Sequence, residues 1–173
     1  GFIGLEIGVK GYGPENHSTY DALLYKGNCI ATSATIARRE LVEAVGGFSE
    51  SLEIVTAEDY HLWLKLAQAG IGDFVDQVLE VTGFMIPVQA IKQAKAVGHV
   101  VEDFFPKQEL RNLREMVGVR LRYGIINYGV GRSMQANRQI FAAWPYFLRS
   151  LYLHPFYIKT YIAIILNTFC IKK

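Results

Sequence analysis

The sequence predicts an α/β fold in which a partial mixed sheet is followed by C-terminal helices. Residues 28–36 combine apolar and β-compatible polar side chains in an imperfect alternation, which is typical of a strand. Short apolar runs at 74–75 and 78–81 indicate one or two further strands. From residue 87 onward, apolar residues recur at helical spacing, so we expect the second half of the chain to be helical.

Composition limits the classes of protein that fit this chain of 173 residues. Its length suits one domain or a large piece of a bigger enzyme. Hydrophobic residues make up 51% of the sequence, which is enough for a core and excludes global disorder. With 18 basic and 16 acidic residues the net charge is only +2, so we expect no nucleic-acid partner.

The cysteines and the start of the chain bear on its cellular setting. Cys29 and Cys170 lie near opposite ends, with no CxxC pair and no histidine cluster, so the sequence offers no metal site. Cys29 falls in an apolar run where a buried thiol is more ordinary than a disulfide, which favours a reducing, cytoplasmic location. The chain opens without a Met or a secretory signal, so we expect it to be an excerpt of a longer protein.

A glycine-rich segment leads into the predicted strand. Its glycines do not have the spacing of a phosphate-binding loop, and residues 20–25 are expected to form one helical turn. The strand carries the hydroxyls of Thr32 and Ser33, which would lie at the mouth of the sheet, where open α/β folds bind ligands. The alternative is that these hydroxyls satisfy nearby backbone groups.

A short helix and a sharp turn follow the strand. Residues 38–45 place Leu41, Val42 and Val45 on one helical face. Gly46 stands where a left-handed residue commonly ends a helix. We therefore expect the helix to stop there.

The next helix holds two adjacent carboxylates, Glu58 and Asp59, in its first turn. Thr56 is the expected N-cap, with Asp59 at the capping-box position three residues on. Beyond the pair, one side of the helix is apolar and the other polar, and Gly70 is expected to end it. The apolar stripe comprises Tyr60, Trp63, Leu64 and Ala67, and the polar side comprises His61, Lys65 and Gln68.

The C-terminal half is predicted as a series of helices. Gly124 is expected to stop the second of them. Its arginines would form a solvated face, and the alternative is that they attract phosphates or anionic lipid. Ser133 is expected to cap the third, and Pro145 to kink or divide it. We expect these helices over 87–99, 106–123 and 133–151, and a last one from residue 154.

The aromatic and basic segment 138–173 leaves two interpretations open. Its final apolar stretch is interrupted by Lys159 and Asn167, and is shorter than the roughly 20 residues that span a bilayer. The segment could make peripheral contact with the interface of an anionic membrane. It could instead pack as a helical cap on the sheet or on a neighbouring subunit.

Three segments stand out within residues 20–82, namely NCIATSATIARREL, VGGFSESL and AEDYHLWLKLAQAG. Together they resemble family-2 glycosyltransferases of the GT-A fold. In that family an apolar strand leads into an Arg-Arg helix, a Gly-Gly-Phe turn and a Glu-Asp pair that opens a helix. The resemblance implies that residues 1–82 are the acceptor-side half of a GT-A domain and that 83–173 are a C-terminal helical extension.

The resemblance also implies roles for individual residues. Asp59 matches the family's catalytic base, and Glu58 lies beside it at the acceptor side of the cleft. The base would take the proton of an acceptor hydroxyl as it attacks the anomeric carbon of a nucleotide-sugar, with inversion. His61 and Trp63 would border the acceptor pocket, although Trp63 also suits the core. The alternative for the carboxylate pair is capping and compensation of the helix dipole.

Other parts of the family's pattern are missing from this chain. The nucleotide-binding half and the Asp-X-Asp ligands of Mg or Mn would precede residue 28, and no such pair occurs. We therefore expect the divalent metal and the nucleotide-sugar donor to bind through residues not present, and this chain alone to be inactive.

The remaining expectations concern partners and location. The acceptor would be a saccharide or a lipid-linked molecule. The expected location is cytoplasmic, and the inner face of the membrane is the option if 138–173 contacts a bilayer. A different class of protein is also compatible with the sequence. This alternative is a non-catalytic helical module that associates with a membrane or binds a partner.

Overall fold

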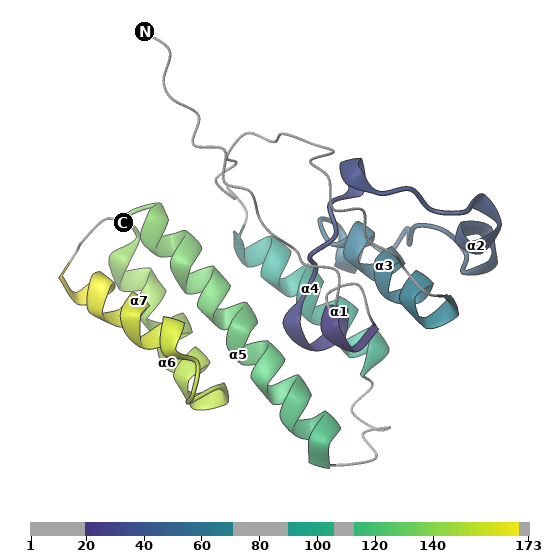
Figure 1. The fold of residues 1–173 in the computed structure, drawn as a ribbon. Coiled ribbons are helices and arrows are strands. Elements are labelled where there is room, and N and C mark those ends of the chain that lie inside the picture. The colour runs from purple at the N-terminus through teal and green to yellow at the C-terminus, as the bar shows by residue number, and fades with distance from the viewer. Residues whose placement is uncertain (1–19, 71–89, 106–112, 170–173) are drawn as a thin grey trace, which may run out of the picture.

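The structure is a computed structural model that describes residues 20–70, 90–105 and 113–169 (Figure 1). Throughout these ranges the regular structure is helical, and none of their residues lies in a strand. In chain order the elements are α1 (Tyr20–Lys26), η1 (Thr32–Ala34), α2 (Arg39–Ala44), η2 (Leu52–Ile54), α3 (Glu58–Ala69), α4 (Ala90–Phe104), α5 (Leu113–Ala136), α6 (Ile140–Leu153) and α7 (Ile158–Thr168), where η marks a 3-10 helix.

The predicted α/β fold, a GT-A-like mixed sheet, is wrong for the part of the chain that the structure describes. Residues 28–36 form the turn η1 between extended residues, with no paired strand among the described ranges. Local bonds occupy this backbone: the Thr35 hydroxyl donates to the Ala31 carbonyl at 2.7 Å. Such side-chain bonds compete with a sheet ladder. The other predicted strands, at 74–75 and 78–81, lie outside the described residues.

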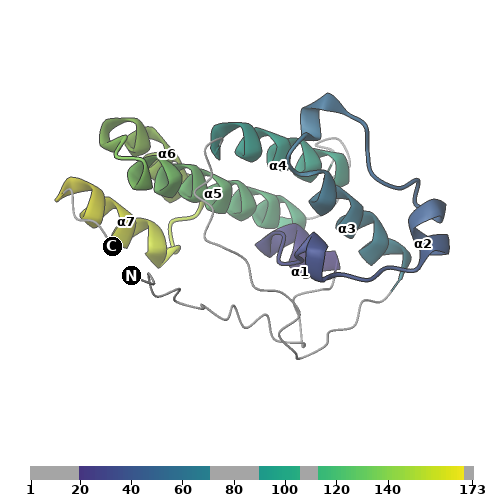
Figure 2. The ribbon, with the colours of Figure 1, turned by 90° about the horizontal axis from the view of Figure 1, so that it is seen from above.

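The long helix α5 is the axis on which the other helices pack. Its 24 residues correspond to a length of about 36 Å. It contacts α1, α4, α6 and α7, with α6 and α7 on one side and α1, α3 and α4 on the other (Figure 1). The view from above shows α2 at the margin, far from α7 (Figure 2).

Glycines along α5 allow its neighbours to approach closely. A Cβ added at Gly124 would lie 2.5 Å from the Cβ of His154, and one at Gly118 would overlap the ring of Tyr25. Gly124 is buried in mid-helix rather than at a helix end, so the prediction that it stops the helix is wrong. Its missing side chain serves helix packing, and the modest cost of glycine inside a helix is accepted there.

Two hydrophobic clusters lie on opposite sides of α5. The first joins α1 and α3 to α4, and the second joins α5, α6 and α7. The first cluster is built from Leu23, Leu24, Ile54, Ala57, Tyr60, Leu62, Trp63, Leu64, Ala96 and Val100. The second is built from Val130, Met134, Ala143, Phe147 and Ala163.

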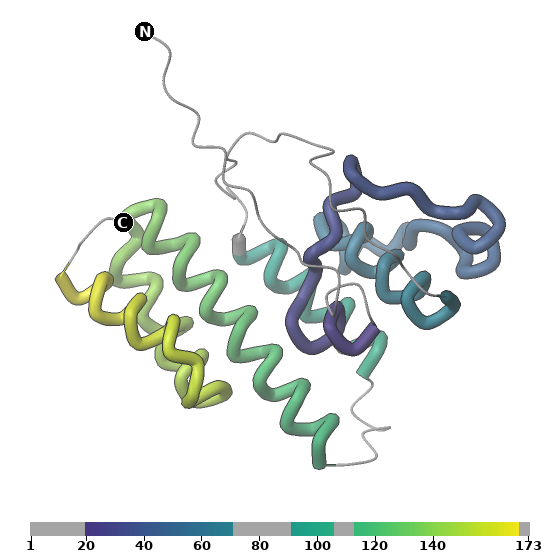
Figure 3. The backbone as a smooth tube through the Cα atoms, in the orientation of Figure 1, coloured from purple at the N-terminus to yellow at the C-terminus, as the bar shows by residue number. Residues whose placement is uncertain are grey.

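Other helix predictions had mixed outcomes. The short helix after residue 38 and its left-handed end are confirmed, because α2 is followed by Gly46 with φ of +79°. Ser133 lies inside α5 and caps no helix, which corrects that prediction. Pro145 lies within α6, which continues to residue 153, and the chain then turns back into α7 (Figure 3).

A pair of identical substitutions in α5 tests the close packing against α6. A Cβ at Gly131 would lie 2.5 Å from the ring of Phe147, which is fully buried, whereas a Cβ at Gly129 meets nothing within 4 Å. We expect Gly129→Ala to raise the free energy of unfolding by about 0.5–1 kcal/mol through helix propensity. We expect Gly131→Ala to lower it by about 1–3 kcal/mol, because overpacking outweighs the same gain. Urea denaturation measures both, and equal effects would contradict the packing.

Candidate functional site

The candidate site lies at the start of α3. The helix begins at Glu58 after Ala57, which makes no side-chain cap, so the prediction of Thr56 as N-cap is wrong. Thr56 instead has a positive φ of +86°, which is uncommon for a β-branched residue. The unpaired backbone N–H groups of a helix N-terminus favour nearby negative charge, and the two carboxylates supply it.

The two adjacent carboxylates make different contacts. One oxygen of Glu58 accepts a hydrogen bond from the backbone N–H of Thr56 at 2.6 Å. This bond holds the turn in which Thr56 has its left-handed conformation. Glu58 therefore has a structural role, which is to stabilise the turn at Thr56.

Asp59 receives hydrogen bonds from side chains of the preceding segment. Its Oδ2 accepts from the hydroxyl of Thr32 at 3.2 Å and from Nδ2 of Asn28 at 3.4 Å. Its Oδ1 accepts from the backbone N–H of Tyr60 at 2.6 Å. Asp59 is half-buried, whereas both side-chain donors are exposed. The carboxylate thus lies at the surface, oriented by neutral donors.

Sequence reasoning missed Asn28. Its Oδ1 accepts the backbone N–H of Ile30 at 3.0 Å, which forms an Asx-turn and leaves Nδ2 for Asp59. The signal was present, because an Asn directly after Gly27, at the end of a helical turn, is typical turn chemistry. The prediction of a strand over 28–36 is incompatible with a turn at Asn28, so the turn was not predicted.

The four predicted acceptor-binding residues fall into two pairs. Thr32 and Ser33 are exposed in η1, and Thr32 bonds directly to Asp59. His61 and Trp63 are buried, with 8% and 6% of their surface exposed. The structure therefore brings Thr32 and Asp59 together, while His61 and Trp63 belong to the core around α3.

His61 faces α4, and this corrects its predicted place on a polar surface. Its Nε2 lies 3.6 Å from a carboxylate oxygen of Asp103, and its ring packs 5.4 Å from that of Phe104. Desolvation by burial lowers the pKa of His61, Lys65 lowers it further, and Asp103 opposes both. The neutral imidazole is thus favoured in the folded protein.

A buried arginine supports the site from α5. The guanidinium of Arg122 donates to the carbonyl of Lys26 at 3.2 Å and lies 5.8 Å from the ring centroid of Tyr60. Tyr60 in turn donates its hydroxyl proton to the carbonyl of Leu23 at 2.8 Å. The expected solvated face of arginines is therefore wrong for Arg122, which is 6% exposed. Its contacts fix α1 against α3, next to the carboxylate pair.

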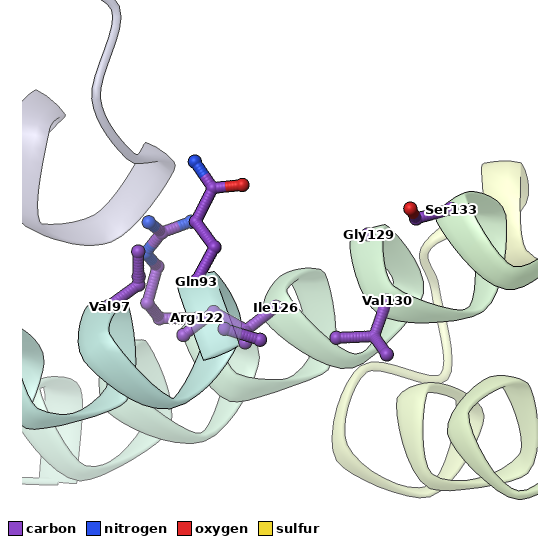
Figure 4. A pocket seen from close by; sticks show the side chains of 8 residues that line it. Gln93, Val97, Arg122, Ile126, Gly129, Val130 and Ser133 are labelled. Carbon is purple, nitrogen blue, oxygen red and sulfur yellow. The ribbon is translucent and has the colours of Figure 1, made fainter. Parts of the chain in front are cut away.

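Pockets also lie on the described helices away from Asp59. One, of about 220 Å³, lies between α4 and α5 (Figure 4). Another, of about 130 Å³, lies between α5 and α7. Asp59 lines neither of them. The first pocket is lined by Gln93, Ala94, Val97, Arg122, Ile126, Gly129, Val130 and Ser133.

The described residues do not fit a divalent metal. Across 20–70, 90–105 and 113–169, no three His, Cys, Asp or Glu side chains gather into a possible ligand set.

Comparisons with protein-family profiles, with curated proteins and with solved structures found no match for this chain. The resemblance to family-2 glycosyltransferases therefore rests on the three sequence segments and their spacing alone.

Gly27 gives a test of how Arg122 supports the site. Both Gly27 and Gly46 have positive φ, +113° and +79°, so an alanine is strained at either position. A Cβ at Gly27 would also lie 2.7 Å from the Arg122 guanidinium, whereas one at Gly46 meets nothing within 4 Å. We expect Gly46→Ala to cost about 1–2 kcal/mol of unfolding free energy, and Gly27→Ala to cost more. Denaturant titration of both variants measures this, and a smaller cost at Gly27 would contradict the contact.

The stability of the protein should also depend on pH through His61. The pKa of His61 is lower in the folded protein than in the unfolded chain. As pH falls through the unfolded pKa of about 6.5, the unfolded chain therefore binds more protons than the folded protein does. Acidification from about pH 7.5 to about pH 5.5 should therefore lower the unfolding free energy. His61→Phe should reduce that loss without abolishing it, because burial also lowers the pKa of His154. An unchanged pH dependence in urea titrations of His61→Phe would refute this prediction.

Proposed function

We propose that Asp59 is the catalytic base of an inverting glycosyl transfer from a nucleotide-sugar to a hydroxyl acceptor. The observation that carries the proposal is the half-buried carboxylate of Asp59, held by the side chains of Thr32 and Asn28. The resemblance of the surrounding segments to family-2 glycosyltransferases supports the same assignment. The acceptor would be a saccharide or a lipid-linked molecule, as in polysaccharide or glycolipid synthesis.

The contacts of Asp59 suit a base that must receive a hydroxyl. The hydrogen bond from the Thr32 hydroxyl, at 3.2 Å, is longer than the usual ~2.5–3.0 Å for a hydroxyl donor, and that from Nδ2 of Asn28, at 3.4 Å, is longer than the usual ~2.7–3.2 Å for an amide donor. An acceptor hydroxyl could therefore replace one of them at small cost. The remaining donor would keep the carboxylate in orientation, which general base catalysis requires.

The proposed step moves one proton and exchanges one bond. The acceptor hydroxyl gives its proton to the Asp59 carboxylate while its oxygen forms a bond to the anomeric carbon. The bond from that carbon to the diphosphate breaks, and the nucleoside diphosphate leaves with the electron pair. Attack opposite the leaving group inverts the configuration. Binding of the nucleotide-sugar would need residues other than those around Asp59.

Glu58 takes a positioning role in this proposal. Its carboxylate already accepts the backbone N–H of Thr56, so it holds the turn that precedes Asp59. The competing explanation for both carboxylates is stabilisation of the α3 N-terminus. Catalysis and stabilisation predict different effects for the same substitution, so the two can be separated by experiment.

The substitution Asp59→Asn in the full-length protein tests the assignment of Asp59 as the base. The amide keeps an oxygen that can accept a hydrogen bond from Thr32, but it cannot take a proton. We expect the transfer rate to fall by about 10²–10⁴-fold, the usual contribution of a general base. The measurement is release of nucleoside diphosphate from UDP- and GDP-sugars in the presence of saccharide and lipid-linked acceptors.

Glu53→Gln is the matched control, because Glu53 is an exposed carboxylate in η2. It should transfer at the wild-type rate. Wild-type transfer by Asp59→Asn would refute the base assignment. A loss of unfolding free energy of about 0.5–2 kcal/mol without a loss of rate would instead favour the stabilising role.

A further inference from the structure

The final helix, α7, has its polar and apolar sides reversed relative to an ordinary surface helix. Its inward positions are Thr160, Ala163 and Asn167, each at most 2% exposed. Its outward positions, spaced by four, three and four residues, are large and apolar. These are Ile158, Ile162 and Ile165, continued by Phe169 directly after the helix, with exposed fractions of 71%, 50%, 56% and 68%.

The inward polar groups of α7 are held by hydrogen bonds. The hydroxyls of Thr160 and Ser150 are 2.9 Å apart, and Nδ2 of Asn167 donates to the carbonyl of Ile140 at 3.1 Å. These bonds join α7 to α6. The reversal is thus a feature of the packing, because the Thr160 hydroxyl and Nδ2 of Asn167 have partners inside while the large apolar side chains face outward.

The preceding helix has an outward apolar stripe as well. Phe141, Pro145, Leu148 and Tyr152 follow each other at four, three and four residues, and all are exposed. Phe156, in the connection between the two helices, is 88% exposed. We call these residues, together with the four outward residues in and directly after α7, the outward apolar stripes. A surface helix normally turns such stripes to the core, so two of them on neighbouring helices indicate an apolar environment.

The charge around the outward apolar stripes has one sign. Residues 116–173 contain no Asp or Glu. Arg138, Arg149 and Lys159 are exposed on or beside α6 and α7. The basic residues of this half are Arg120, Arg122, Arg132, Arg138, Arg149, Lys159, Lys172 and Lys173.

We propose that α6 and α7 bind the surface of an anionic lipid bilayer, with the outward apolar stripes in the interfacial layer. Exposed basic side chains next to apolar stripes match lipid headgroups above acyl chains. A second copy of the chain would place like charges together, which disfavours self-association through this face. The proposal does not depend on the assignment of Asp59.

The lengths of the helices favour a position along the membrane surface. At 14 and 11 residues, α6 and α7 measure about 21 and 17 Å, against a hydrocarbon core of about 30 Å. None of the described helices is both long and apolar enough to cross a bilayer.

Co-sedimentation with lipid vesicles tests this proposal in the whole protein. Binding to phosphatidylcholine vesicles is compared with binding to vesicles in which phosphatidylglycerol replaces about a third of that lipid. We expect the anionic vesicles to bind more tightly, and salt to weaken that binding. Ile162→Glu should weaken it about tenfold or more, because a charge then enters the apolar layer. Lys159→Gln should weaken it about fivefold.

Ile36→Glu is the matched control, because Ile36 is fully exposed and lies outside α6 and α7. It should bind anionic vesicles as tightly as the wild type. If Ile162→Glu lowers the thermal unfolding midpoint, Ile165→Ser provides the second test, with a smaller loss of binding expected.

Three outcomes would overturn the proposal. One is equal binding to both kinds of vesicle, and another is an equal loss for Ile36→Glu and Ile162→Glu. The third is concentration-dependent self-association that Ile162→Glu abolishes while vesicles bind neither protein, because it would assign the outward apolar stripes to a second copy.

Discussion

The buried guanidinium of Arg122 is the contact on which the arrangement of the N-terminal helices depends. It reaches from α5 to the carbonyl of Lys26 and to the ring of Tyr60, so one side chain joins α1, α3 and α5. Lys26 precedes Asn28 by two residues, and Tyr60 directly follows Asp59. Arg122 therefore holds together the two segments that carry Asn28 and Asp59. Gly27 allows this approach because any Cβ there would occupy the place of the guanidinium.

The periodicity of the sequence predicted helices well and their limits poorly. The helices α1, α2, α3 and most of the C-terminal half could be predicted. In α3 the apolar spacing is also the pattern that packing uses, because Tyr60, Trp63 and Leu64 of the predicted stripe are buried. The stop predicted at Gly124 failed because a glycine that ends a helix and one that admits a neighbouring helix are identical in sequence. The strand at 28–36 failed for a related reason. β-compatible residues form a strand only where a second strand pairs with their backbone N–H and C=O groups. In this segment the Thr35 hydroxyl instead bonds the backbone locally.

The candidate site shows the same division between local and distant information. The pairing of Glu58 with Asp59 was visible because adjacent carboxylates at a helix start are a local signal. Their different contacts were not visible, because these depend on residues brought close by folding. The prediction placed His61 on the polar side of α3, because a helical wheel divides a helix into one apolar and one polar side. In the structure α3 packs against α1 on one side and α4 on another. A helix packed on several sides buries a polar residue that its own stripe would expose.

The hydrogen bonds between α6 and α7 have a consequence for how this pair of helices responds to its solvent. Packing driven by the release of water from apolar surface weakens when the surroundings become apolar. The contact of Ser150 with Thr160, and of Asn167 with the carbonyl of Ile140, relies instead on polar groups, whose attraction grows as the dielectric constant falls. These two polar contacts are thus suited to persist in water and in a less polar medium alike.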